Sequence, residues 1–250
     1  MAALQFCSRP VSLRDRMKHL LYCFIEQGLV EPLAESEMCV VAGPGLAAVA
    51  RKIEDSSSAP SISTLLAFAK AVEKIHAGQA VIPLRYGCAL ESEAAISRLL
   101  AERRQEYEAL FDRLRGMVEM GIRVLWEDGR GLRPQFRAAS PFSPGVSPGV
   151  SAGAAYLAAL RNRYPSENGL APQESQLAGR IGHLLSGCFT QQRRESAPAA
   201  QGRLLSLYFL TPKTDVERFQ NKARHIGAPD GAKLLFSGPW PPYNFTSLGD

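Results

Sequence analysis

The residue types that most often carry out chemistry are scattered along this chain rather than clustered. No two histidines are four residues apart, and the cysteines show neither the CxxC spacing of a redox motif nor the spacing of a zinc site. The sequence therefore predicts no metal site, and it predicts free, buried thiols in a reducing cytoplasm. The residues concerned are His19, His76, His183, His225, Cys7, Cys23, Cys39, Cys88 and Cys188.

A glycine-rich segment, Gly43-Pro-Gly45-Leu-Ala-Ala48, superficially matches the GxGxxA fingerprint of dinucleotide-binding folds. That fold needs an acidic residue about 20 residues further on to bind the ribose, and Ser63 stands there instead. Pro44 also removes a backbone donor from the turn that would face the pyrophosphate. The sequence contains no phosphate-binding loop of the Walker type and no GxSxG elbow. We therefore expect no cofactor, and we predict a turn from strand to helix at this point.

An arginine stands within the apolar segment Val81-Ile-Pro-Leu-Arg-Tyr-Gly87. An arginine in such a segment must reach the surface or meet a carboxylate, because an unpaired buried charge is costly. Glu119 also lies within an apolar strand pattern, so it is a candidate partner for Arg85. The alternative interpretation is an arginine on the solvated face of an edge strand.

The C-terminal segment Gly238-Pro-Trp-Pro-Pro-Tyr-Asn-Phe245 combines prolines with aromatic residues. Proline fixes φ, so the backbone is stiff and loses little entropy on docking, while aromatic side chains supply buried area. Two interpretations are open: the segment packs on its own chain, or it binds a partner. The candidate residues are Trp240, Pro241, Pro242, Tyr243 and Phe245.

The elements that must position these residues follow from apolar periodicity and from glycine and proline breaks. We expect a loose arm over residues 1–17 and an irregular stretch over 128–149. The expected strands are 19–26, 37–42, 79–86, 117–126, 203–211 and 233–237. The expected helices are 46–53, 62–76 (capped by Ser61 or Ser63), 92–115, 151–163, 173–190 and 214–225, with a polar break at 191–202.

This order of elements indicates an α+β protein of two domains, because regular βαβ repeats are missing. The N-terminal domain, residues 1–115, is a mixed α+β domain that ends in a long bridging helix. The C-terminal domain, residues 116–250, fits a split βαβ, or ferredoxin-like, plan. It is extended by additional helices and by the tail of prolines and aromatic residues.

Charge and hydropathy exclude several classes of partner. The chain has 250 residues, 29 basic and 24 acidic, and the two signs interleave, so the net charge of +5 forms no dedicated nucleic-acid surface. Glu102, Glu106 and Glu108 lie among arginines, as on a solvated helix face. The longest apolar runs, Leu20–Ile25 and Leu204–Leu210, are far shorter than the about 20 residues that span a bilayer. We expect a soluble, cytosolic protein that binds neither nucleic acid nor membrane.

The two unusual segments occur together with two others in an order that resembles the gas vesicle protein F/L family (GvpF/GvpL). The resemblance covers roughly residues 19–245, and the terminal motif is its most specific part. Tyr86 and Cys88 replace the usual Phe and Thr, and the third segment is a degenerate form of SPGxxYL. The matching segments are Ile82-Pro-Leu-Arg-Tyr-Gly-Cys88, Gly116-Met-Val-Glu-Met-Gly-Ile-Arg-Val124, Ser151-Ala-Gly-Ala-Ala-Tyr-Leu157 and Gly238–Phe245.

This resemblance implies a non-enzymatic accessory protein of gas vesicle assembly, located at the gas vesicle in the cytoplasm. It implies binding to the hydrophobic shell subunit and to other accessory proteins, with no catalytic site and no cofactor. The candidate contacts are Trp240, Tyr243 and Phe245, with Arg85 organising the fold beside them. The competing hypothesis is a cytosolic α+β enzyme with a dispersed pocket. A nucleic-acid-binding ferredoxin-like domain is disfavoured, because the adjacent Tyr208 and Phe209 point to opposite sheet faces.

Overall fold

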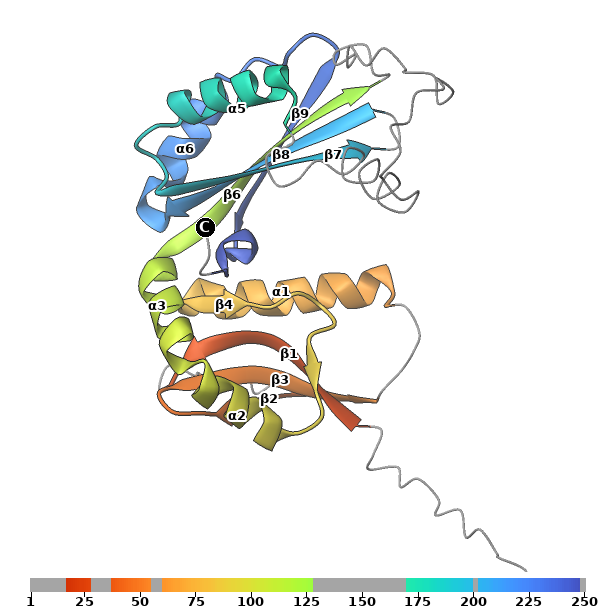
Figure 1. Cartoon of the computed structure of the whole chain (residues 1–250), viewed down its shortest axis with the longest axis vertical. Coiled ribbons are helices and arrows are strands. Elements are labelled where there is room, and N and C mark those ends of the chain that lie inside the picture. Colours follow the sequence, from red (N-terminus) through yellow and green to blue (C-terminus); the bar gives the residue numbers. More distant parts are fainter. Residues whose placement is uncertain (1–16, 28–36, 55–59, 128–169, 200–201, 248–250) are drawn as a thin grey trace, which may run out of the picture. The chain divides into compact units, whose positions relative to one another are not determined.

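The chain forms two compact units in the computed structural model (Figure 1). One contains Met1–Met117 together with Trp240–Asp250, and the other contains Val118–Pro239. The C-terminal segment, which we expected in the C-terminal domain, therefore belongs to the N-terminal unit. The expected stretch at 128–149, the helix at 151–163 and nearly all of the N-terminal arm lie outside the described residues. The structure describes residues 17–27, 37–54, 60–127, 170–199 and 202–247.

The N-terminal unit is built on an antiparallel sheet with the strand order β2-β3-β1-β4, and β5 also pairs with β1. The single strand expected over 79–86 is shorter and is followed by a second short strand. Pro83 ends the edge strand, where its missing N–H group does not interrupt a ladder. The strands are β1 (Met17–Glu26), β2 (Met38–Ala42), β3 (Leu46–Glu54), β4 (Val81–Pro83) and β5 (Ala89–Leu90).

The short helix expected over residues 46–53 is wrong, because this segment is β3, the partner of β2 in a hairpin. The glycine-rich segment is the hairpin turn: Gly43 N donates to Leu46 O at 2.8 Å, and Gly45 has a φ of 75°. β3 lies between β2 and β1, so its first five residues are buried. A strand buried on both faces shows no polar alternation, and its apolar run can match helical spacing by coincidence.

Three helices accompany this sheet: α1 (Ile62–Gly78), α2 (Glu93–Glu102) and α3 (Arg104–Leu114). Ser61, one of the two residues expected to cap this helix, caps α1: its Oγ accepts a hydrogen bond from Thr64 N at 3.1 Å. The single helix expected over 92–115 is interrupted at Arg103, which has φ −108° and ψ 21°. Leu100 and Tyr107, on either side of the break, are both buried. The helical spacing of apolar residues therefore continues across Arg103, and the sequence pattern does not reveal the break.

A β-bulge in β1 explains why its apolar run does not alternate. The register of β1 on β3 shifts between Leu21 and Cys23. The extra residue lets the adjacent Tyr22 and Cys23 join the same core cluster, which α1 also lines. Phe24 points to the opposite face, where its ring centroid is 4.7 Å from that of Tyr107 on α3. Helices therefore pack on both faces of the sheet (Figure 1).

The second unit has a sheet with the strand order β7-β8-β6-β9. In chain order the elements alternate as strand, helix, two strands, helix and strand, which is the split βαβ plan expected from the sequence. The fold is therefore α+β with a ferredoxin-like second unit. Its elements are β6 (Met117–Glu127), α5 (Pro172–Leu184), β7 (Gln191–Ala199), β8 (Gly202–Pro212), the 3₁₀ turn η2 (Lys213–Asp215), α6 (Val216–Ala223) and β9 (Ala232–Trp240).

The polar break expected over residues 191–202 is wrong, because most of it forms β7. This strand pairs antiparallel with β8 from Gln191↔Leu210 to Ala199↔Gly202. β7 is an outer strand of the sheet, and none of its residues is fully buried. Backbone hydrogen bonds define a strand in such a position, so its side chains need no apolar alternation.

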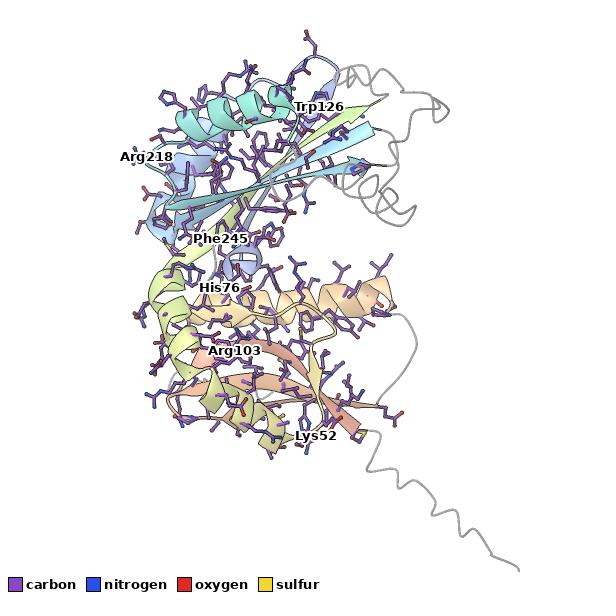
Figure 2. The ribbon with its side chains drawn as sticks, viewed as in Figure 1. Lys52, His76, Arg103, Trp126, Arg218 and Phe245 are labelled. Carbon is purple, nitrogen blue, oxygen red and sulfur yellow. The ribbon has the colours of Figure 1, made fainter. Side chains whose placement is uncertain are left out.

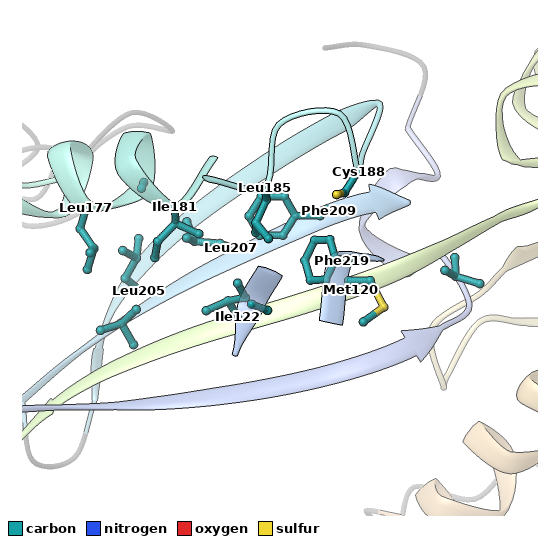
Figure 3. Close-up of a cluster of buried hydrophobic side chains, with 14 of the residues drawn as sticks. Met120, Ile122, Leu177, Ile181, Leu185, Cys188, Leu205, Leu207, Phe209 and Phe219 are labelled. Carbon is teal, nitrogen blue, oxygen red and sulfur yellow. The ribbon is translucent and has the colours of Figure 1, made fainter. Parts of the chain in front are cut away.

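The core of the second unit lies between one face of its sheet and the helices α5 and α6 (Figure 3). Phe209 of β8 is fully buried, and its ring centroid lies 5.0 Å from Phe189 and 5.3 Å from Phe219 of α6. The alternating residues of β6 contribute to the same cluster, as their period-two pattern predicts. They are Val118, Met120, Ile122, Val124 and Trp126.

A buried carboxylate fastens α5 to the sheet. Glu174 has no exposed side-chain surface, and its Oε2 accepts from Ala171 N at 2.8 Å, at the start of α5. Its Oε1 accepts from Ser196 Oγ of β7 at 2.8 Å and from Arg203 Nε of β8 at 2.9 Å. Three elements therefore converge on one side chain, which satisfies the hydrogen-bonding needs of a buried charge.

Candidate interaction surface

The C-terminal segment folds back as a short 3₁₀ turn, η3 (Tyr243–Phe245), within the N-terminal unit (Figure 2). Tyr243 N donates to Pro241 O at 2.8 Å, and Phe245 N donates to Pro242 O at 3.1 Å. Both prolines are buried, and Phe245 is 1% exposed. Burial of these residues supports the interpretation that this part of the segment packs on its own chain.

Arg113 of α3 clamps the segment from the side. Its Nη2 atom donates to Phe245 O and to Ser247 O, each at 2.7 Å. Hydrogen bonds from a charged donor contribute more than neutral ones, and here they fix two backbone carbonyls that lie more than 130 positions away in sequence. Sequence reasoning missed Arg113, because it was one of several arginines on an apparently solvated helix.

Tyr243 of the segment packs against the aromatic cluster under α1. In that cluster Tyr22 stacks on Phe68 at a centroid distance of 4.5 Å, and Phe68 meets Tyr86 edge-on at 5.3 Å. Burial raises the pKa of Tyr22 above its usual value of 10.0, against an opposing effect of Arg51. The segment therefore completes an apolar core that the rest of the N-terminal unit forms only in part.

The structure places Arg85 on the surface beside the docked segment. It is exposed, and its Nη2 atom lies 3.5 Å from Asn244 Oδ1, a long hydrogen bond. Glu119, the partner considered for it, belongs to the second unit, where it is 5% exposed on β6. Arg85 thus lies beside the segment, and its role in organising this region stays a prediction.

Trp240 differs from the rest of the segment, because 41% of its surface is exposed. A second set of exposed apolar side chains lies on α1 of the same unit: Ile62 is 78% exposed, Leu65 40% and Leu66 57%. Spacings of three and four residues place these three on one helical face, which we call the α1 stripe. The inward face of α1 is supplied by other residues, the buried Phe68, Val72 and Ile75.

Among the described residues, no three or more His, Cys, Asp or Glu side chains form a group that could hold a metal ion. None of the helices in the described ranges is long and apolar enough to cross a bilayer. The glutamates among the arginines face solvent in ion pairs, as expected: Arg104 Nε lies 2.7 Å from Glu108 Oε1, and Arg103 Nε lies 2.8 Å from Glu106 Oε2.

These features define a class of protein: an α+β chain of two units, one of them ferredoxin-like, with a C-terminal segment clamped onto the N-terminal unit and apolar side chains exposed nearby. The chain belongs to the gas vesicle synthesis protein GvpL/GvpF family, whose sequence model matches residues 18–247. The resemblance seen in the sequence motifs is thereby confirmed.

Two curated relatives carry gas vesicle names. Gas vesicle protein L of a Streptomyces strain is 23% identical over 175 residues, which cover 68% of this chain and 63% of the relative. Gas vesicle protein L2 of Halobacterium salinarum is 38% identical over 56 residues, which cover 22% of this chain and 20% of the relative. The matched regions therefore span less than two thirds of either relative.

Two solved structures share the fold. The crystal structure of GvpF from Anabaena sp. PCC7120 superposes with a TM-score of 0.67 at 14% identity, covering 94% of this chain and 98% of that one. GvpF from Microcystis aeruginosa gives a TM-score of 0.61 at 14% identity, covering 92% and 99%. At this level of identity the likeness establishes the α+β architecture alone.

Proposed function

We propose that this chain is a non-enzymatic accessory protein that acts in the cytoplasm during nucleation or growth of the gas vesicle. In this role it binds the hydrophobic shell subunit and other accessory proteins of the vesicle. Membership of the GvpL/GvpF family supports a role in gas vesicle synthesis. The observation that supports a binding role is the α1 stripe, together with the exposed Trp240.

Burial energetics explain why such a surface suits this partner. A subunit that lines a gas-filled shell must present apolar faces, and these aggregate unless another surface covers them before assembly. Ile62, Leu65 and Leu66 can cover such a face, because burying each large apolar side chain contributes about 1.5–3 kcal/mol. Trp240 adds the residue type that most often dominates binding energy at interfaces.

The test is co-purification of the full chain with the co-expressed shell subunit. We expect the double variant Ile62→Ser/Leu66→Ser to weaken shell-subunit binding by tenfold or more, while thermal unfolding stays within a few degrees of the wild type. The matched control is Lys70→Ser/Lys74→Ser, which changes two other exposed positions of α1 and should leave binding unaltered. Unchanged binding by the Ile62→Ser/Leu66→Ser protein would refute the assignment of this surface.

The C-terminal segment requires a paired comparison. Trp240→Ala should reduce shell-subunit binding and should destabilise the protein less than Phe245→Ala does, because 41% of the Trp240 surface is exposed. Phe245→Ala should instead destabilise the protein by about 3–5 kcal/mol, because its ring is buried. If Trp240→Ala leaves binding intact while the α1 variant loses it, the contact surface excludes the C-terminal segment.

A further inference from the structure

The second unit contains a pocket that the proposed function does not use. Its volume is about 380 Å³, and it lies between α6 and the strands β6 and β9. Its walls are mainly apolar, and they come from Met120 of β6, Phe219 and Ala223 of α6, and Phe236 of β9. Figure 3 shows Met120 and Phe219 next to each other at this end of the core. The pocket is large enough for one or two apolar side chains.

Small residues keep the pocket open. Gly121 has no side chain, and a Cβ placed there would lie 2.5 Å from Ser237 Oγ, so a larger residue would require the Ser237 side chain to move. Ala223 faces the same space from α6, where a larger side chain would fill it. Phe236 lies at the open side of the pocket and is 49% exposed.

The positively charged Arg224 also lines the pocket. Arg224 caps the C-terminal end of α6, and it is exposed. Within the described ranges the Arg224 guanidinium forms no ion pair. The two nearby cations have partners: Lys222 Nζ donates to Ser186 O at 3.0 Å, and Arg218 Nη1 lies 3.7 Å from Asp215 Oδ1. Arg224 is thus the cation at this rim that is available for an incoming carboxylate, with which it can form a bidentate pair.

The pocket lies beside β9, one edge of which pairs with none of the strands in the described ranges. Among the described strands β9 has a single neighbour, β6, so the backbone groups of its other edge have no strand partner. Leu235 and Phe236 of β9 are 54% and 49% exposed, on opposite faces of that strand. The other outer strand, β7, carries Arg193, Arg194, Glu195 and Pro198, which are residue types that discourage strand addition. β9 carries two such residues, Lys233 and Pro239, and neither lies within its Leu234–Phe236 stretch. That stretch is the part of the edge suited to pairing.

We propose that the free edge of β9 and the adjoining pocket bind an extended segment of another protein as an added strand. Backbone hydrogen bonds to β9 hold the segment, one of its apolar side chains enters the pocket beside Phe236, and a neighbouring Asp or Glu pairs with Arg224. This is recognition by β-augmentation, in which main-chain bonds supply affinity and a side-chain pocket supplies specificity. The site lies in a different unit from the α1 stripe, so it does not depend on the proposed function.

The experiment is a selection of random nonapeptides displayed on phage against the full chain. The expected peptides carry a large apolar residue with Asp or Glu within two positions. Their affinity, measured with synthetic peptides by fluorescence anisotropy, should fall at least about tenfold on Arg224→Glu and on Gln220→Phe, which fills the pocket from its rim. A peptide with proline at the central position should also lose binding, because proline cannot donate to the strand ladder.

Three controls keep this test decisive. Arg180→Glu changes an exposed arginine of α5 and should leave peptide affinity unaltered. Thermal unfolding must show that the Arg224→Glu and Gln220→Phe proteins are folded, and selection on Arg224→Glu should enrich Lys and Arg in place of Asp and Glu. The proposal is overturned if no peptide is enriched, if the same acidic peptides bind Arg224→Glu equally well, or if the edge proves to pair with a second copy of this chain by sedimentation.

Discussion

At the scale of single residues, the C-terminal segment divides into two kinds of position. Phe245 is 1% exposed and its carbonyl is held by Arg113, whereas Trp240 is 41% exposed. Of the two interpretations open at the sequence level, packing on its own chain therefore applies to Phe245, and binding a partner is proposed for Trp240. Aromatic type and spacing alone could not separate them, because burial depends on where the rest of the unit lies.

Buried acids give the N-terminal unit a predictable response to high pH. Burial raises the pKa of the Cys23 thiol from 9.0 to about 12, and burial also raises the pKa values of Tyr22 and Tyr107. The folded state therefore favours the protonated thiol, so the unfolded state loses its proton first. We expect the contribution of these groups to the free energy of unfolding to be fully present below about pH 8 and to be lost as pH rises from about 9 towards 12. Urea titrations at several pH values measure this fall.

Thiol labelling checks the same inference by a second route. Cys88 is exposed, contrary to the expectation that all cysteines are buried, whereas Cys23 has no exposed surface. With iodoacetamide at pH 8, mass spectrometry should show rapid modification of Cys88 and protection of Cys23 until urea unfolds the chain. Equal rates at both positions in the native protein would contradict the burial of Cys23.

At the scale of secondary structure, Glu174 is expected to hold α5 against β7 and β8. Glu174→Ala removes the acceptor for Ser196, Arg203 and the α5 N-terminus, and it leaves the Arg203 guanidinium without its carboxylate. We expect a loss of about 3–5 kcal/mol in the free energy of unfolding, measured by urea denaturation. Glu102→Ala, an exposed position on α2, is the control and should change stability by no more than about 0.5 kcal/mol. A similar small effect of Glu174→Ala would show that the buried pair is energetically neutral.

The sequence predicted best those elements that bury one face. β6 places every second residue from Val118 to Trp126 in the core and α1 begins at a capping serine, so both were predicted correctly. β3 and β7 were missed for opposite reasons: the first half of β3 is buried on both faces, and β7 is a polar outer strand. In both strands the pairing partner, rather than the local pattern, determines the structure. The break at Arg103 was missed because the apolar stripe continues across it.

The candidate surface was predicted only in part for a related reason. Trp240 was identified from its motif, but Arg113 and the α1 stripe were not. Arg113 becomes notable only when Phe245 and Ser247 arrive beside it from the far end of the chain. The α1 stripe could not be identified from the sequence, because the exposure of Ile62 and Leu66 depends on which elements pack against α1.

At the scale of the whole molecule, we expect the last residues to stabilise the first unit more than the second. Deleting residues 240–250 removes the buried Phe245 and both Arg113 bonds, so the N-terminal unit should lose more than the about 3–5 kcal/mol expected for Phe245→Ala alone. The chain has two tryptophans, and Trp126 lies in the core of the second unit. The truncated protein lacks Trp240, so its fluorescence reports Trp126 alone, and full-length Trp240→Phe isolates the same signal. The unfolding midpoint measured by fluorescence should be the same in these two proteins.

Hydrogen exchange supplies the complementary measurement for this truncation. Amides of α1 and β1 should exchange faster after residues 240–250 are removed, whereas amides of β8 should keep their protection. A matching loss of protection in β8 would show that the segment supports both units.

The return of the C-terminal segment also sets an order for folding. Because residues 118–239 separate the two parts of the N-terminal unit, that unit stays incomplete on a nascent chain until the entire second unit has been synthesised. β6 and β9 are neighbours in the second sheet, so folding of that sheet brings the outgoing and returning strands together. Once the second unit has folded, residues 118–239 no longer form a long flexible loop between the two parts of the N-terminal unit. Bringing these two parts together then has a smaller entropic cost. The ferredoxin-like unit thus acts as a folding template for the unit that precedes it in the chain.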